Sequence, residues 1–236
     1  MNKVLCGIVL AVFLGASTAY GGLLDGFLEK INPPAVGDAD QTISALKEAL
    51  SIGTGKAVEK ISLADGYLSN EAIKILMPEK IQNVADMLKK VGYGNQVDAF
   101  ILSMNRAAEA AAPKAKSYFI GAIKEMTFSD ARKILNGGDT AATDYLRSKT
   151  FKKIYAAFKP TVASSLDQVG GTRAYKDMMR TFTSLPFISA QSFDLDHYVT
   201  DRSLQGLFYM TAQEEKKIRT DPTARVTDLL KNVFGK

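Results

Sequence analysis

A long helical pattern at residues 97–126, in the middle of the chain, constrains the fold more than any other feature. Before Pro113, apolar residues recur every three or four positions and so share one face of a helix; they are Val97, Phe100, Ile101, Met104, Ala108 and Ala111. The pattern resumes after Pro113 with Ala115, Tyr118, Phe119, Ala122, Ile123 and Met126. Residues 107–112 are alanines except for Glu109, which lets neighbouring helices approach closely. We predict a central hairpin or kinked helix of an all-α domain, broken at Pro113 because proline removes a helical hydrogen bond.

Capping residues, glycines and prolines divide the remaining chain into further predicted helices. Their expected bounds are about 38–61, 78–90, 127–135, 139–147, 149–169, 172–185, 194–219 and 221–234. Gly53 and Gly55 can break the first of these helices, and Pro160 interrupts the one at 149–169. Alternating apolar residues at 73–77 fit one short extended segment. The predicted fold class is therefore all-α, a single multi-helix domain at residues 38–236, orthogonal or bundle-like, with about ten helices.

Residues 1–19 have the pattern of a secretory signal peptide. Lys3 gives a basic start, residues 4–16 are apolar and uncharged, and small residues follow up to Ala19. The apolar run is shorter than the roughly 20 residues that a membrane span needs. We expect cleavage after Ala19, to within about two residues, and export to the periplasm. Residues 20–37 are expected to form a flexible lead-in with one short amphipathic helix, either a tether that docks on the core or a helix that binds a membrane surface or a partner.

The scarcity of cysteine and histidine excludes several kinds of site. Cys6 is the only cysteine and lies in the predicted signal peptide, so the mature chain would have no disulfide, thiol nucleophile or cysteine-linked haem. His197 is the only histidine, whereas a histidine zinc site usually needs two or three. Neither a G-x-S-x-G elbow nor a G-x-x-x-x-G-K-[ST] phosphate loop occurs in the sequence. We therefore expect no cofactor and no metal.

The distribution of charge along the chain indicates which partners are to be expected. The chain has 30 Lys and Arg residues against 25 Asp and Glu residues, a net charge of +5. The basic residues are spread along the chain, and no dense basic block indicates nucleic acid as a partner. No second apolar stretch approaches membrane-spanning length, so we predict no transmembrane segment in the mature chain.

Asn105, Arg106 and Glu109 form the main candidate polar site. They lie three and four positions apart on the central helix and interrupt a surface that is otherwise apolar and rich in alanine. One interpretation is a site in a helix bundle that recognises a small ligand or performs acid–base chemistry. The other is an internal network of ion pairs and caps that ties helices together, because buried charges are usually paired for structural reasons.

A second, weaker candidate cluster consists of Asp194, Asp196, His197 and Asp201. Three carboxylates and an imidazole within eight residues can hold a hard cation or transfer protons. Asp194 and Asp196 also stand where a helix N-cap is expected. The simpler interpretation is a helix start with His197 in its first turn.

Several short motifs, taken together, resemble the bacterial domain-of-unknown-function family numbered 4197. They are ALKEAL at 45–50, NRAAE at 105–109 with PK at 113–114, MTFSDA at 126–131, AATDY at 141–145, YVT at 198–200, GLF at 206–208, EE at 214–215, and IR at 218–219 before DP at 221–222. The resemblance covers about residues 45–234. It implies an exported, all-helical, single-domain protein, and it implies no particular activity.

These observations lead to one functional expectation and two alternatives. We expect a non-enzymatic binding or envelope-associated interaction module, whose partner would be an envelope protein or a small ligand. A carboxylate-based hydrolase or lyase is one alternative, and it requires the candidate side chains to meet in a pocket that solvent reaches. A carrier of an apolar ligand is the other, and it requires an apolar cavity between helices.

Overall fold

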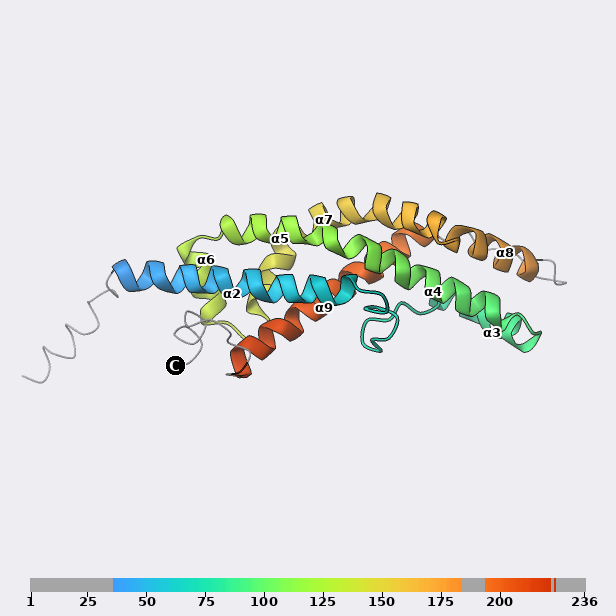
Figure 1. Ribbon diagram of the computed structural model, residues 1–236, viewed down its shortest axis with the longest axis horizontal. Coiled ribbons are helices and arrows are strands. Elements are labelled where there is room, and N and C mark those ends of the chain that lie inside the picture. The colour runs from blue at the N-terminus through green and yellow to red at the C-terminus, as the bar shows by residue number, and fades with distance from the viewer. Residues whose placement is uncertain (1–35, 184–193, 222, 224–236) are drawn as a thin grey trace, which may run out of the picture. The chain divides into compact units, whose positions relative to one another are not determined.

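The computed structural model describes residues 36–183, 194–221 and 223, and its regular structure there is entirely helical (Figure 1). The chain divides into two compact units, Met1–Asp40 and Gln41–Lys236, and the packing described below lies within the second unit. The helices are α2 (Val36–Ser62), η1 (Glu79–Ile81), α3 (Gln82–Lys90), α4 (Gly94–Ala111), η2 (Ala112–Lys114), α5 (Ala115–Lys124), α6 (Phe128–Leu135), α7 (Ala141–Gln168), α8 (Gly171–Thr183) and α9 (Leu195–Thr220). The predicted all-α class is confirmed, but only eight of these elements in the described residues are α-helices, against about ten predicted helices, and the other two, η1 and η2, are single 3₁₀ turns.

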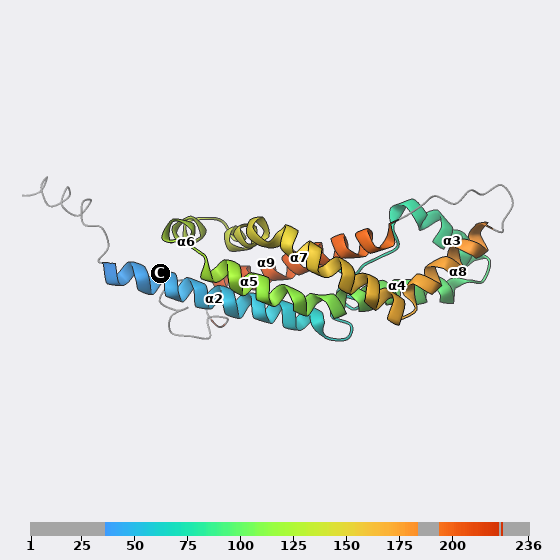
Figure 2. The same ribbon diagram turned by 90° about the horizontal axis from the view of Figure 1, so that it is seen from above.

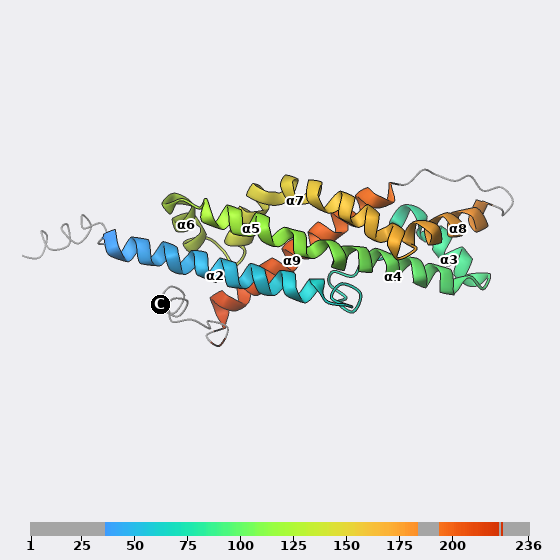
Figure 3. The same ribbon diagram turned by 45° about the horizontal axis from the view of Figure 1, so that its top comes forward.

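Helix α7 lies at the centre of the packing and contacts α4, α5, α8 and α9. Figures 2 and 3 show α4 and α5 as one nearly continuous rod beside α7, with α9 crossing both at an angle. The core contains fully buried rings from four of these helices, Phe100, Phe119, Phe158 and Phe208. The predicted alanine-rich stretch lies inside this core, since Ala107, Ala108, Ala111 and Ala112 are fully buried. Small side chains at these positions let the helices pack closely.

The α-helical pattern is interrupted at Pro113, as predicted, but α4 and α5 stay nearly collinear and form neither a hairpin nor a sharp kink (Figures 2 and 3). The α-helical pattern of α4 ends at Ala111, η2 forms one tighter turn that contains Pro113, and α5 begins at Ala115. Proline is tolerated in this first turn because the hydrogen bond that it cannot donate is not needed there. The apolar face therefore continues from Phe100 to Phe119 in spite of the proline.

Three predicted interruptions are absent, and the loss of the one near residue 148 lowers the helix count. The helices predicted at 139–147 and 149–169 form one helix, α7, which also continues through Pro160. Gly53 and Gly55 lie within an unbroken α2. In α7 a single buried stripe runs the length of the helix, and it comprises Leu146, Thr150, Ile154, Phe158, Val162 and Leu166. Packing of this stripe against neighbouring helices outweighs the local cost of proline.

Local signals located several helix ends correctly. Thr127 and Asp130 form the predicted capping box of α6, with each side chain accepting from the other residue's backbone N–H. The Asp194 carboxylate caps α9 and accepts from the backbone N–H of His197 at 2.9 Å. The predicted signal peptide, most of the lead-in at 20–37 and the last predicted helix lie outside the described residues. Within the described residues, no helix is both long enough and apolar enough to cross a membrane.

The segment at 63–78 joins α2 to η1 through turns and irregular backbone, and we call it the 63–78 loop (teal in Figure 1). The extended segment predicted at 73–77 forms no strand there. Irregular segments longer than about 12–15 residues are uncommon in compact domains and are usually functional. This loop also buries Tyr67, Ile73, Ile75 and Met77 in the core.

Candidate functional site: the 63–78 loop and its groove on α9

The first half of the loop is held by a chain of charges that includes two predicted site residues. Glu109 accepts the backbone N–H groups of Tyr67 and Leu68 at 3.1 and 3.4 Å through one oxygen. Its other oxygen accepts from Arg106 at 2.7 Å, and Arg106 also donates to Asp65 at 2.7 Å. The hydrogen bonds to Glu109 and then to Asp65 raise the pKa of Arg106. This chain of charges satisfies a carboxylate that is only 5% exposed.

The second half of the loop is held by the third predicted residue, Asn105. Its side-chain amide donates to the backbone oxygen of Ile75 at 2.9 Å and accepts the backbone N–H of Ile75 at 2.9 Å. The same amide donates to the backbone oxygen of Ile101, one turn earlier in α4, at 2.8 Å. Asn105 is fully buried, so these bonds satisfy backbone groups that water cannot reach.

Helix α9 holds the loop from the other side. The Tyr67 hydroxyl donates to the backbone oxygen of Ser203 at 2.7 Å, and the Tyr198 hydroxyl donates to that of Leu76 at 3.0 Å. Burial, and next the charge of Glu109, raises the pKa of Tyr67 far above its usual range. At Gly206 an added Cβ would lie 2.6 Å from the Tyr67 ring and 3.2 Å from Ile73. The loop therefore packs this closely on α9 because residue 206 has no side chain.

A surface groove of about 240 Å³ lies where the loop meets α9, and we call it the α9 groove. It is lined by Ala72, Ile73, Lys74, Arg202, Gln205, Gly206 and Tyr209. Arg202 donates to the side-chain oxygen of Gln205 at 3.1 Å, and Gln205 donates to Asp201 at 2.6 Å. Tyr209 is 43% exposed at the groove. The groove thus combines two cations, an amide and an aromatic ring on a rigid frame.

The second predicted cluster is divided by the structure. Asp194 and His197 lie at the start of α9, where Lys159 is 3.7 Å from Asp194 and the Tyr155 hydroxyl is 2.7 Å from Nδ1 of His197. The hydrogen bond from the His197 backbone lowers the pKa of Asp194. Asp201 lies further along the helix and contacts Gln205 at the α9 groove instead.

Asp196 lies in the first turn of α9. Burial, and next the charge of Asp194, raises the pKa of Asp196. Among the described residues, no three His, Cys, Asp or Glu side chains come together in a way that could hold a metal ion. Of the carboxylates at the start of α9, Asp194 serves as a cap and as the ion-pair partner of Lys159.

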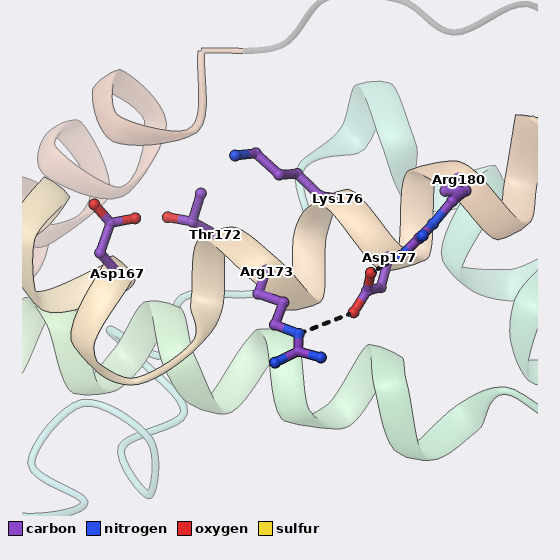
Figure 4. A pocket seen from close by; sticks show the side chains of 6 residues that line it. All are labelled: Asp167, Thr172, Arg173, Lys176, Asp177 and Arg180. Atoms are coloured by element: carbon purple, nitrogen blue, oxygen red, sulfur yellow. Dashed lines mark hydrogen bonds and ion pairs between the residues drawn. The ribbon is translucent and has the colours of Figure 1, made fainter.

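A larger surface pocket, of about 560 Å³, lies along α8 (Figure 4). It is lined by Asp167, Thr172, Arg173, Lys176, Asp177 and Arg180. Arg173 and Arg180 both form ion pairs with Asp177, whereas Lys176 points away from these three side chains (Figure 4). All but Asp167 come from α8, so one exposed helix forms most of the pocket wall. Asp177 pairs with two of the three cations, and in the described part of the chain none of the six lining residues is buried.

Sequence reasoning identified the anchors of the loop and missed what they position. Lys74, Arg202, Gln205 and Tyr209 carried no motif, because each is an ordinary surface residue when considered alone. Two features of the sequence together could have indicated the loop. One is the stretch 63–78, which has no helical pattern, and the other is the set of polar residues inside the apolar face of the next long helix. Tyr67, directly after the Asp65-Gly66 turn, belongs to the same signal.

The fold and the site define a class of protein: an all-α domain in which buried polar side chains hold one irregular loop against two helices. Residues 37–235 match the family described as Protein of unknown function (DUF4197), and the chain belongs to this family. The resemblance noted from the sequence motifs is thereby confirmed. Neither the curated proteins nor the solved structures contain a match to the chain.

Proposed function

We propose that the protein is a non-enzymatic binding module that acts after export to the periplasm, and that the α9 groove is its binding surface. The observation that carries this proposal is the set of buried bonds that hold the 63–78 loop. Glu109, Asn105 and Tyr67 fix the backbone of the loop, and the loop in turn presents Lys74 beside Arg202 and Tyr209. A surface whose backbone is already fixed loses little entropy when it binds a partner.

The enzyme alternative has less support from this geometry. Glu109 is 5% exposed and accepts bonds from Arg106 and from two backbone N–H groups. A general acid or base must reach the substrate proton directly or through one water. Arg106 is 31% exposed but is held between two carboxylates. The two strongest candidates for carboxylate chemistry are thus occupied in holding the loop.

The apolar-carrier alternative also has less support. The two apolar pockets between α2, α7 and α9, both lined in part by Ala49, Leu50 and Ile218, have volumes of about 10 Å³ each. This volume is close to that of a single water-sized probe, whereas ligand pockets hold about 300–1,000 Å³. In the part of the chain that the structure describes, these pockets would have to open before a lipid could enter.

Export is proposed from the N-terminal sequence pattern. The test is the intact mass of the protein recovered from the periplasmic fraction of cells that express the full chain. A mass equal to that of the chain from Tyr20 to Lys236 is expected. An uncleaved protein in the cytoplasmic fraction would contradict the export proposal without affecting the groove.

The groove is tested by site-specific photocrosslinking in the same cells. The photoreactive residue p-benzoylphenylalanine replaces Tyr209 in one variant and Phe128 in a matched control. The two native rings are 43% and 46% exposed, but Phe128 lies on α6, away from the groove. We expect a discrete adduct at position 209 and none at position 128.

A second pair of variants tests whether the groove itself is the contact. Ala72→Trp would fill the groove, whereas Ala64→Trp adds the same ring elsewhere on the loop, and both native alanines are exposed. The adduct at position 209 should disappear with Ala72→Trp and persist with Ala64→Trp. Equal adducts at positions 209 and 128, or no adduct at 209, would refute the binding surface.

A further inference from the structure

We propose that the α9 groove binds a carboxylate whose carbon skeleton is planar and apolar, with Arg202 and Lys74 holding the carboxylate and Tyr209 packing on the skeleton. This inference rests on the proposed function and specifies the ligand class of the same surface. It follows from three features of the groove: two cations without close ion pairs, the hydrogen bonds that orient Arg202, and the small size of the groove beside an exposed ring.

The two cations of the groove are only loosely paired with the two carboxylates near them, Glu71 and Asp201. Within residues 36–183 and 194–221, Arg202 has no ion-pair partner; its guanidinium contacts the Gln205 oxygen and lies 5.3 Å from the centre of the Tyr198 ring. Lys74 forms only a long ion pair, 3.8 Å, with Glu71, whose side chain is 87% exposed. Such an exposed pair contributes little and is readily exchanged for another anion. Both cations can therefore exchange their present contacts for an anionic ligand.

A chain of hydrogen bonds orients Arg202. The Asp201 carboxylate can only accept, so Gln205 must turn its NH₂ group towards it, and the bond is 2.6 Å long. The Gln205 oxygen then faces Arg202 and accepts from one Nη atom at 3.1 Å. The remaining N–H groups of the guanidinium lie in one plane. This planar arrangement matches the two oxygens of a carboxylate, which the single point charge of an ammonium group does not.

The size and the walls of the groove select the rest of the ligand. A volume of about 240 Å³ is below the range of drug-sized ligand pockets, so it admits about one ring with its carboxylate. Ala72 and Gly206 contribute almost no side-chain bulk, and Ile73 contributes an apolar wall. The exposed ring of Tyr209 offers a flat apolar surface at the same place. A planar, apolar skeleton fits these walls.

The test is titration of the ¹⁵N-labelled protein, purified from cells that express the full chain, with small probes followed by NMR. Benzoate is expected to shift the amide signals of Lys74, Arg202 and Gly206. Benzyl alcohol has the same ring without the charge, and acetate has the charge without the ring, so both should bind at least about tenfold more weakly, the effect of losing one favourable contact. Inorganic phosphate should bind more weakly than benzoate.

Variants assign the contacts. Arg202→Gln and Lys74→Met should each weaken benzoate binding by about tenfold or more, because each removes a charge-assisted hydrogen bond. Lys116→Met removes an exposed lysine on α5 and is the matched control, with binding unchanged. The two groove variants change different elements, α9 and the loop, so a folding defect in one leaves the other informative.

A pair of short peptides that end in phenylalanine, one with a free carboxylate and one amidated, identifies the source of the ligand. If the free-acid peptide binds more tightly than benzoate and the amidated peptide does not bind, the natural ligand is a chain terminus. If the free-acid peptide binds no better than benzoate, the ligand is a small free acid.

Two results would overturn the carboxylate assignment. One is a benzoate titration that leaves the three groove amides unshifted, and the other is phosphate binding as tight as benzoate binding. In either case a photocrosslink at position 209 that Ala72→Trp abolishes would still support the groove as a binding surface for another ligand. If position 209 of the otherwise native protein formed no crosslink, the proposed function itself would be refuted.

Discussion

The side-chain amide of Asn105 pairs with the backbone of Ile75 in the way that a neighbouring β-strand would. One hydrogen bond of 2.9 Å runs in each direction between them. An irregular segment can therefore enter the core without a sheet, because a single buried side chain supplies both the donor and the acceptor that the backbone needs.

Replacing Asn105 with alanine should destabilise the protein by about 2–4 kcal/mol, because the N–H and C=O of Ile75 would both remain buried without partners. The free energy of unfolding from urea titration measures this loss. Hydrogen exchange at the Ile75 amide should also become faster, since that amide loses its acceptor. The control is Asn95→Ala, at an exposed position of the same helix, which should change stability by no more than about 0.5 kcal/mol. Equal effects of the two substitutions would show that the pairing contributes nothing.

Glu215 caps helix α7 from a distant part of the chain. Glu215→Gln should lower the free energy of unfolding by about 2–4 kcal/mol. The reason is that an amide replaces a charged acceptor and turns its NH₂ group towards other donors. Its carboxylate accepts from the backbone N–H groups of Ala142 and Thr143 at 2.9 and 2.8 Å, and from Arg219 at 3.0 Å. Chemical denaturation measures the change, with Glu125→Gln at an exposed position as the control. A stability equal to that of the control would mean that α7 needs no cap from α9.

Two glycines should respond to alanine in opposite directions. Gly206→Ala is expected to destabilise the protein by about 1–3 kcal/mol, because the new Cβ would overlap the buried ring of Tyr67. Gly121→Ala, in α5 with no atom within 4 Å of its new Cβ, should stabilise it by about 0.5–1 kcal/mol. Melting temperatures of the two variants give the comparison, and a Gly206→Ala variant as stable as the native protein would be inconsistent with close packing of the loop on α9.

The pair formed by Glu214 and Lys60 should make stability depend on pH. Burial acts to raise the pKa of Glu214, but the hydrogen bond from Lys60 at 2.5 Å, with the charges of Lys60 and Lys217, lowers it below the ordinary value of 4.5. A lowered pKa in the folded state means that the stabilisation is present above pH 4.5 and is lost as the pH falls through the folded-state value.

We therefore expect the stability difference between the native protein and Glu214→Gln to be largest near neutral pH and to shrink below pH 4.5. Urea unfolding at a series of pH values from 7 to 3 measures this difference. Glu59→Gln, at an exposed position of α2, is the control and should give a difference near zero throughout. A constant difference across the series would mean that the ion pair does not set the pKa of Glu214.

Sequence reasoning succeeded where the signal and its effect lie within one turn of helix. The Thr127–Asp130 capping box, the Asp194 cap and the break at Pro113 each depend on residues three or four positions apart. It failed at the start of α7: the helix was predicted to begin at residue 139, but α7 begins at Ala141 and is capped by Glu215, more than 70 positions away. A distant cap leaves no local pattern.

The candidate site also has one part that the sequence could predict and one part that it could not. Asn105, Arg106 and Glu109 were recognisable because polar side chains are costly in an apolar helix face and must have partners. Their partners were not recognisable, because Ile75 and Tyr67 are 30 and 42 positions away along the chain. The sequence could not tell whether the three residues bind a ligand or hold a loop, because that depends on which segment of the chain packs against them in the fold.

The sequence by itself determined the all-α class, most helix ends and the polar interruption of the central helix, since hydrophobic periodicity and capping act within one or two turns of the same helix. Only the tertiary structure decided that α7 runs unbroken through Pro160, that the 63–78 loop lies between α4 and α9, and that Lys74 lies in one groove with Arg202 and Tyr209. These outcomes depend on packing between segments far apart in the chain, and the free energy of that packing outweighs local preference.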